Sequence, residues 1–501
     1  MKKNNILLAL SLILGTVSII NACDKDDKGN SESDNNHTCN FPISKAIKSI
    51  PRPTLGMRWV LIDELSDEFN GTKLDDKKWY DYHPSWQGRP PGLFMSEQVS
   101  VKDGCLVLEG GKLEAGETVT VKTGYEGNVG TRTHIAVDKF KEGMTGYNVK
   151  CAAVVAKSLT AHYDTYYECK VKANKTLLST TFWLSQHGKQ VNAEGKQPSA
   201  VWNGGSFGQE LDFLECIGHG GNFTGSFFSK GMHSNAHFWY KEGGVGPTID
   251  FRAKESTLHR TDNKLPSDDF NVYGCWWVNE SQAKFYLNNS QSNTMDFNVK
   301  VNPTNESKYN GVEFAFTEKM GMNLVMETYT WFYETKPGSS AWGDRIQNSD
   351  GTYNLVLPTD EELNDPTKNK NYYDWVRCYK LKEDTFAVDD ALEYVMFENH
   401  ISMYEKPKVL ISKNNKFIIK LEYTASKNSE IEFALYDLES KKLQSQVETV
   451  YAGYGNSSFS FDIAGADLDK GKNYYMVVSL RAKNSKNSDS AYETDSFKFR
   501  Y

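Results

Sequence analysis

Residues 208–221 read G-Q-E-L-D-F-L-E-C-I-G-H-G-G and place three acidic side chains, Glu210, Asp212 and Glu215, within six residues. Polar and apolar residues alternate from Glu210 to Phe213, which is the period of a β-strand with one solvated face. Because Glu210 and Glu215 are an odd number of residues apart, strict alternation would point them to opposite faces. One β-bulge between them returns both to the same face, and bulges are frequent beside active sites.

The spacing of this pair fits the chemistry of retaining glycoside hydrolysis. With a bulge, the two Cα atoms lie roughly 13 Å apart at about 3.3 Å per residue, and leaning side chains leave about 5–6 Å between the carboxyl groups. A retaining mechanism needs about 5–5.5 Å between nucleophile and acid/base. We therefore predict that Glu210 and Glu215 form a catalytic pair. The alternative is an acidic strand edge that faces solvent, since charged side chains are mostly exposed.

The pattern E-x-D-x-x-E resembles the bulged active-site strand of glycoside hydrolase family 16. By position, this resemblance implies that Glu210 is the nucleophile, Glu215 the acid/base and Asp212 the residue that supports the nucleophile. Further stretches resemble strands of the same family in the expected order: D-E-F-N-G at 67–71, V-S-V-K-D-G-C-L at 99–106, Y-E-C-K-V-K-A at 167–173, T-F-W-L at 181–184, F-N-V-Y-G at 270–274 and D-W-V-R-C-Y at 374–379.

The strand patterns predict an all-β protein. From Trp59 onward, short strand patterns alternate with Gly, Asp and Asn, without sustained helical periodicity. The resemblance implies that residues 46–383 form a β-jelly roll of two curved sheets with an open concave cleft. After a connector at 384–399, residues 400–501 predict a smaller β-sandwich of immunoglobulin-like or carbohydrate-binding type. Every candidate catalytic residue precedes this second unit, so we expect its removal to spare the cleavage of short oligosaccharides.

The N-terminus carries the signals of an exported lipoprotein. A basic start precedes an apolar run at 6–20, which is shorter than the ~20 residues of a membrane-spanning helix. We predict a signal peptide at 1–22 and a lipid-anchored flexible tether at 23–45, with Cys23 as the lipidated residue. The acidic stretch after Cys23 resembles the export tag of Bacteroidetes surface lipoproteins, so we expect exposure on the outer membrane. The alternative is an ordinary secretory signal in which Cys23 is incidental.

Composition argues against other kinds of partner and site. The formal net charge of −8, with no basic cluster, argues against nucleic-acid binding. Four cysteines lie in apolar strand-like runs without metal-ligand spacing: Cys105, Cys169, Cys275 and Cys378. We interpret them as small buried side chains rather than a disulfide framework or a zinc site.

The family resemblance bears on metals as well. It implies no required cofactor, although many members carry a structural calcium ion that is held partly by the aspartate of the closing strand, here Asp374. Oxygen ligands of this kind suit calcium. The alternative is that Asp374 pairs with Arg377 or with a backbone amide.

The expected cleft carries aromatic and basic side chains that suit a galactan. Segment 83–94 contains three prolines, which stiffen its backbone. It resembles a rim loop of the family's red-algal galactanases, in which Trp86 would stack on a sugar and Arg89 would contact a hydroxyl pair or a sulfate. An ordinary surface loop with a buried Trp86 is the alternative. The resemblance places further cleft residues at Trp183, His237 and Trp331, with a purely structural histidine as the alternative for His237.

We therefore predict a retaining endo-hydrolase of β-1,4-galactosidic linkages in agar-type red-algal polysaccharides, either agarose or porphyran. The alternatives are a laminarinase-type β-glucanase, a carrageenase, or a non-catalytic surface protein that captures glycans. Two close carboxylates disfavour the last alternative, since a binding protein gains nothing from them. The negative charges of Glu210 and Asp212 are expected to raise the pKa of Glu215, as an acid catalyst requires.

Overall fold

The computed structural model describes Pro51 and residues 57–186, 206–244, 247–288, 290–292, 294–297, 300–301, 306–309, 315–383, 399–425, 428–451, 453–483 and 491–501. The predicted signal peptide, the tether with Cys23 and nearly all of the predicted connector lie outside these residues. Among the described residues, no helix combines the length and the apolar character needed to cross a membrane.

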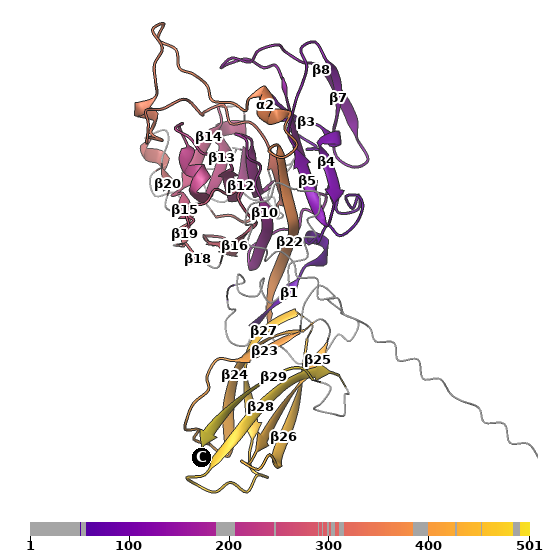
Figure 1. The fold of residues 1–501 in the computed structure, drawn as a ribbon, viewed down its shortest axis with the longest axis vertical. Coiled ribbons are helices and arrows are strands. Elements are labelled where there is room, and N and C mark those ends of the chain that lie inside the picture. Colours follow the sequence, from indigo (N-terminus) through magenta and orange to yellow (C-terminus); the bar gives the residue numbers. More distant parts are fainter. Residues whose placement is uncertain are drawn as a thin grey trace, which may run out of the picture.

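Two large, mainly antiparallel sheets build the N-terminal unit, as predicted (Figure 1). The first, which we call the groove sheet, has the strand order β2-β9-β21-β11-β12-β13-β14-β20. Its strands are β2 (Trp79–Tyr80), β9 (Val149–Ala156), β21 (Gly321–Met326), β11 (Ser179–Ser185), β12 (Ser206–Ile217), β13 (Gly231–Lys241), β14 (Ile249–Ala253) and β20 (Lys300–Val301). Three short strands join it at the side: β3 (Gly92–Phe94), β6 (Gly111–Lys112) and β15 (Ser256–His259).

The second sheet, which we call the outer sheet, runs in the order β18-β17-β16-β10-β22-β1-β27-β24-β23. Its strands are β18 (Ser290–Gln291), β17 (Gln282–Leu287), β16 (Asn271–Asn279), β10 (Thr165–Lys172), β22 (Lys370–Glu383), β1 (Met57–Leu61), β27 (Gly453–Asp462), β24 (Lys416–Ala425) and β23 (His400–Met403). Shorter pieces at its side are β4 (Val99–Lys102), β5 (Cys105–Glu109) and β19 (Met295–Asp296), while β7 (Thr118–Thr123) and β8 (Gly130–Ile135) form a separate hairpin. The α-helix α2 (Asp360–Leu363) is a single turn.

The main core lies between these two sheets. Leu211, Phe213 and Leu214 of β12 are fully buried in it. The ring of Phe213 stacks on Tyr167 of β10 at 5.0 Å, which ties the groove sheet to the outer sheet. Since these apolar side chains point inward, the acidic side chains between them are left to the opposite face of β12.

The C-terminal unit is a sandwich of two sheets, as predicted. One is the end of the outer sheet, β27-β24-β23, and the other has the order β26-β25-β28-β29. The second sheet consists of β26 (Lys442–Val450), β25 (Ser429–Tyr436), β28 (Asn473–Ala482) and β29 (Ala491–Arg500). Buried side chains from both sheets form one apolar cluster between them.

The two units share a sheet, which the sequence did not predict. β1 pairs with β22 on one side and with β27 on the other, so that Trp59 lies opposite both Leu381 and Tyr454. Figure 1 shows β1 at this junction. Trp59 and Tyr454 are buried in one aromatic cluster with Trp375 and Tyr379. The C-terminal unit is therefore built onto the N-terminal unit.

The cysteines differ from the prediction at one position. Cys105 is in a disulfide bond, so its interpretation as a free buried side chain was wrong. An apolar strand pattern records burial, and burial is compatible with a disulfide. Among the described residues, five free and buried cysteines remain: Cys151, Cys169, Cys216, Cys275 and Cys378.

Candidate active site

The register of β12 contains the predicted bulge. Against β13, Glu210 lies opposite His237 and Asp212 opposite Asn235, and the register shifts between Asp212 and Glu215. Phe213 and Leu214 are consecutive and both buried, so the strand takes one extra residue into the core at this point. This shift returns Glu215 to the face of Glu210, as the parity argument required.

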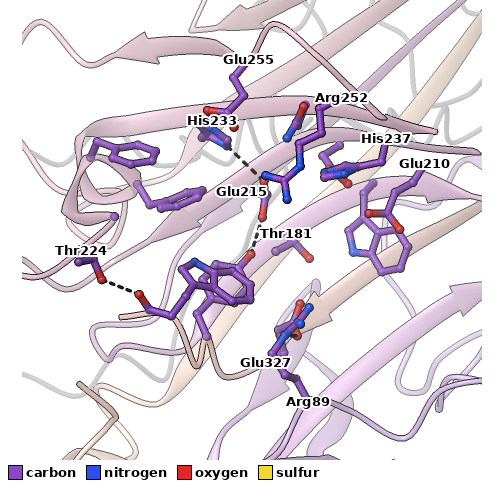
Figure 2. A pocket seen from close by; sticks show the side chains of 18 of the residues that line it. Arg89, Thr181, Glu210, Glu215, Thr224, His233, His237, Arg252, Glu255 and Glu327 are labelled. Atoms are coloured by element: carbon purple, nitrogen blue, oxygen red, sulfur yellow. Dashed lines mark hydrogen bonds and ion pairs between the residues drawn. The ribbon is translucent and has the colours of Figure 1, made fainter. Parts of the chain in front are cut away.

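A cavity of about 810 Å³ covers this part of the groove sheet. The residues of the predicted catalytic and substrate-binding sets all line it: Trp86, Arg89, Trp183, Glu210, Asp212, Glu215, His237 and Trp331. Figure 2 shows Glu210, Glu215, Arg89 and Arg252 around this space. The structure thus brings together side chains from the rim loop, β11, β12, β13 and the segment after β21.

At the Glu210 end of the cavity, the imidazole of His237 lies between two aspartates. His237 Nε2 lies 3.4 Å from Asp212 Oδ2, and its Nδ1 lies 2.8 Å from Asp250 Oδ1. Asp250 in turn accepts a hydrogen bond from Arg252 Nε at 2.6 Å. Trp239 stacks flat on the imidazole at 5.1 Å and fixes its plane.

Electrostatics at this end favour a protonated Glu210 in the free protein. Burial, reinforced by the negative charge of Asp212, raises the pKa of Glu210 to about 8. Burial lowers the pKa of His237, but its hydrogen bonds to Asp212 and Asp250 outweigh this and raise that pKa well above the ordinary value. His237 is therefore a cation that offsets part of the carboxylate charge.

The Glu215 end has different partners. Tyr329 donates its hydroxyl to Glu215 Oε1 at 2.8 Å, and His233 Nδ1 lies 3.2 Å from Glu215 Oε2. The other imidazole nitrogen, Nε2, lies 3.0 Å from Glu255 Oε2. Figure 2 shows His233 between Glu215 and Glu255.

These partners overturn one expectation. Burial raises the pKa of Glu215, but the hydrogen bonds from His233 and Tyr329 outweigh it and leave the pKa below its ordinary value. The predicted rise was wrong for the free protein, because the sequence showed the like charges on β12 and not the donors, His233 on β13 and Tyr329 after β21. The parity argument correctly placed the two side chains on one face, whereas the pKa of Glu215 depends on His233 and Tyr329, 18 and 114 residues away in the chain.

The rim loop is fastened to the segment after β21. Arg89 Nε donates to Glu327 Oε2 at 2.9 Å, and Glu327 is nearly buried. The Arg89 guanidinium also lies 4.7 Å from the ring centre of Trp331 and 5.6 Å from that of Trp86. Arg89 thus joins the two predicted sugar platforms across the cavity, and Glu327 offsets its charge.

Several lining residues were not predicted as site residues: His233, Trp239, Arg252, Glu255, Glu327, Tyr329 and Trp342. One signal was available for His233, because residues four apart on a strand share a face and His237 was already a candidate. The same signal applied to Trp239, two residues after His237 on β13. The other five side chains come from other strands and loops. Their position depends on pairings that a single sequence does not display.

Comparison with known proteins identifies the family. The profile described as "Beta-porphyranase A-D, GH16 domain" matches residues 59–381, and that of the "Porphyranase-associated domain" matches residues 401–494. The chain belongs to the β-porphyranase group of glycoside hydrolase family 16. It is therefore a glycoside hydrolase, and the predicted family and galactanase branch are confirmed.

Individual relatives cover most of the chain. Beta-porphyranase D of Zobellia galactanivorans is 39% identical over 446 residues, which is 87% of this chain and 88% of that protein. Beta-porphyranase B of Phocaeicola plebeius is 33% identical and covers 67% of this chain and 88% of its own. The crystal structure of a β-porphyranase from the human gut bacterium Bacteroides plebeius matches with 30% identity and a TM-score of 0.49, over 68% of this chain and 98% of that one.

The calcium ion implied by the family does not suit the surroundings of Asp374. Its carboxylate is 1% exposed and lies 2.8 Å from the Lys170 ammonium. Arg377, the partner considered from the sequence, instead forms two hydrogen bonds with Glu68. Burial raises the pKa of Asp374 to about 7. The Lys170 ammonium already supplies the positive charge beside this carboxylate, so the surroundings of Asp374 do not fit a Ca²⁺ ion.

Proposed function

We propose that this glycoside hydrolase cleaves β-1,4-galactosidic linkages within agar-type red-algal polysaccharides and retains the anomeric configuration. One observation carries the proposal: Glu210 and Glu215 project from a bulged strand into one cavity lined by Trp86, Trp183 and Trp331. Two carboxylates that line one cavity suit the double-displacement reaction. Aromatic faces of this kind suit the apolar faces of sugar rings.

In the proposed reaction, Glu210 attacks the anomeric carbon and Glu215 protonates the leaving oxygen. Glu215 then removes a proton from water, which attacks the glycosyl-enzyme intermediate. Asp212 and the protonated His237 keep the nucleophile oriented. Because Glu210 has to be ionised to attack, kcat/KM should fall as the pH drops below its raised pKa of about 8.

We further propose that sulfated porphyran is preferred over agarose and that Arg252 contacts the sulfate. The preference for porphyran is supported by the relatives that are named as β-porphyranases. Arg252 lines the cavity, is 51% exposed and bonds to Asp250 through Nε. Arg89, the residue considered from the sequence, is bonded to nearly buried Glu327 and lies between two tryptophans. A guanidinium that is less enclosed is the better ligand for a large anion.

Product analysis tests the proposal. The purified protein is incubated with porphyran, agarose, carrageenan and laminarin, and the oligosaccharides are separated and measured. We expect products from porphyran first, with the β-anomer as the first reducing end seen by NMR. An α-anomer would refute retention, and cleavage of laminarin or carrageenan alone would assign the protein to those activities instead. An Asp212→Asn, Glu210→Gln double variant serves as the inactive control.

We also propose that the protein is an outer-membrane lipoprotein displayed at the cell surface and anchored through Cys23. The basic and apolar N-terminal pattern followed by Cys23 supports this. Metabolic labelling with a fatty-acid analogue checks it. Label on the natural protein and none on Cys23→Ala is expected, and equal labelling of both would refute it.

A further inference from the structure

His233 is enclosed between two carboxylates that belong to different parts of the cavity wall. Its side chain is 4% exposed, and its two ring nitrogens lie 3.2 Å from Glu215 and 3.0 Å from Glu255. Phe228 and Phe227 cover the ring at 4.5 and 5.3 Å between centroids. Glu255 also lines the cavity and is 45% exposed, so the row Glu215–His233–Glu255 joins two carboxylates of the cavity wall through a buried imidazole.

This arrangement restricts where protons can lie. Ionised carboxylates only accept hydrogen bonds, so an imidazole with a carboxylate at each nitrogen satisfies both contacts only when both nitrogens carry a proton. One other arrangement satisfies the same contacts with the same number of protons. In it, the proton of His233 Nδ1 has moved to Glu215 Oε2, and the resulting carboxylic acid donates back to Nδ1. The two arrangements differ by one shift along a single hydrogen bond.

We propose that His233, oriented by Glu255, is a positioning residue that stores the proton which Glu215 delivers to the leaving oxygen. The inference rests on the proposed retaining mechanism, and it assigns a role to two residues that the mechanism did not use. The acid of the reaction is then the row of three groups, with Glu215 as the member that touches the substrate.

The proton balance closes over the two steps. In the first step, the O–H of Glu215 gives its proton to the leaving oxygen while the C–O bond breaks and Glu210 forms a bond to the anomeric carbon. The row then holds one proton fewer. In the second step, Glu215 takes a proton from water, the water oxygen bonds to the anomeric carbon and Glu210 departs. That proton passes to His233 Nδ1, which restores the starting state.

Electrostatics agree with this storage. Burial disfavours the cation, yet the hydrogen bonds to Glu215 and Glu255 raise the pKa of His233 to about 9. The same hydrogen bond from His233 lowers the pKa of Glu255. Other titratable or charged groups face this row from the surrounding elements: Glu210 and Asp212 of β12, His237 of β13, Arg252 of β14, and Glu327 and Tyr329 after β21.

If His233 stores the proton, the pH above which activity is lost depends on Glu215, His233 and Glu255 together. Without His233, the pKa of Glu215 would depend on burial, which raises it, and on Tyr329, which lowers it. The reaction would then lose its acid when that single carboxyl group ionises. If the proton is stored on His233, activity persists until the row as a whole gives it up, near the His233 pKa of about 9. The two cases differ in the pH profile and not only in the rate.

The test is the pH dependence of kcat/KM, measured on the polymer cleaved best, for the natural protein, Glu255→Gln and His233→Gln. We expect the alkaline limb near pH 9 in the natural protein. Glu255→Gln should move it about one pH unit lower, because the imidazolium loses one of its two carboxylates. His233→Gln should move it further and lower kcat by about 10–100-fold, in the range of general acid–base effects. Glu361→Gln on α2, which does not line the cavity, should leave the limb in place.

The proton-storage proposal would be overturned if the alkaline limb were unchanged in both variants. This holds when the natural protein is active and circular dichroism shows that all proteins are folded. ¹⁵N NMR of the histidine rings gives a readout without substrate. Two protonated nitrogens on His233 at neutral pH, with titration shifted down in Glu255→Gln, are expected, and a neutral ring there would overturn the inference. A natural protein that cleaves none of the galactans would instead refute the proposed function.

Discussion

Two histidines on β13, four residues apart, serve the two ends of the cavity in different ways. His233 contacts the carboxylate of Glu215 directly, whereas His237 contacts Asp212, the neighbour of Glu210. Each imidazole has a second carboxylate behind it, Glu255 or Asp250. In the proposed mechanism, the acid/base Glu215 therefore contacts a titratable ring directly. The proposed nucleophile Glu210 is supported only through Asp212, which leaves its lone pairs available.

The largest effect is expected from removing either carboxylate. Glu210→Gln and Glu215→Gln should each lower kcat by about 10³-fold or more, since the two groups act as a unit. Adding azide to Glu210→Ala and to Glu215→Ala separates the two roles. The nucleophile variant should yield an α-glycosyl azide and the acid/base variant a β-glycosyl azide. Either Gln variant retaining more than about a tenth of the rate, a loss of only ~1.4 kcal/mol, would refute that residue's role.

Next in size is the loss of the imidazole at the nucleophile's end. The positive charge of His237 lowers the pKa of Glu210, so His237→Asn should raise that pKa and move the acid limb of kcat/KM to higher pH. At neutral pH the rate should fall about 10–100-fold, or ~1.4–2.7 kcal/mol. The alkaline limb, assigned to His233, should stay in place. His259→Asn on β15 outside the cavity is the matched control, and a shift of both limbs together would remove the proposed distinction.

A smaller and selective effect separates the two arginines of the cavity. Arg252→Ala should lower kcat/KM on porphyran about 10-fold, ~1.4 kcal/mol, with little change on agarose. Arg89→Ala should lower kcat/KM equally on both polymers. It should also lower the melting temperature, because Glu327 would remain buried without its partner. A porphyran-selective loss in Arg89→Ala would return the sulfate contact to Arg89, as considered from the sequence.

The smallest effect on chemistry is expected from the junction between the two units. Tyr454→Ala should lower the free energy of unfolding by about 3 kcal/mol, since this ring is fully enclosed with Trp59, Trp375 and Tyr379. Both limbs of the pH profile should be unchanged in the folded protein. Tyr475→Ala on β28, outside this cluster, is the control. A change at only one end of the cavity would show that the junction communicates with the site.

Removing residues 400–501 goes further than this substitution. The sequence predicted that such a deletion spares the cleavage of short oligosaccharides, because all candidate catalytic residues lie earlier. The shared sheet adds a stability effect, because β1 would lose β27 as a neighbour and Trp59 would be exposed. We expect a lower melting temperature together with retained cleavage where the protein stays folded.

The acidic strand was predictable because its evidence is local. The odd spacing of Glu210 and Glu215 demanded a bulge, and the extra buried residue at Phe213 supplies it. The rim loop was predictable from its three prolines. Each of these features can be read from a few neighbouring residues and the geometry of one strand.

The contacts that set protonation were not predictable, because they join distant parts of the chain. Arg89 and Glu327 are 238 residues apart, and Tyr329 reaches Glu215 across 114. His233 was visible as a histidine on the right face, but its second carboxylate at Glu255 depends on how β13 and β15 are joined. The error over the pKa of Glu215 follows from these missing partners.

The position of β1 has a consequence for the order of folding. This strand lies near the start of the described chain, yet its partners are β22 at 370–383 and β27 at 453–462. The entropy cost of closing a loop of several hundred residues arises before the stabilising contacts of β1 can form, and this slows folding. Until β27 has been synthesised, β1 presents an unpaired edge beside Trp59. The outer sheet can therefore be completed only after residues 453–462 have been made, and a chain terminated before them would expose an aggregation-prone strand.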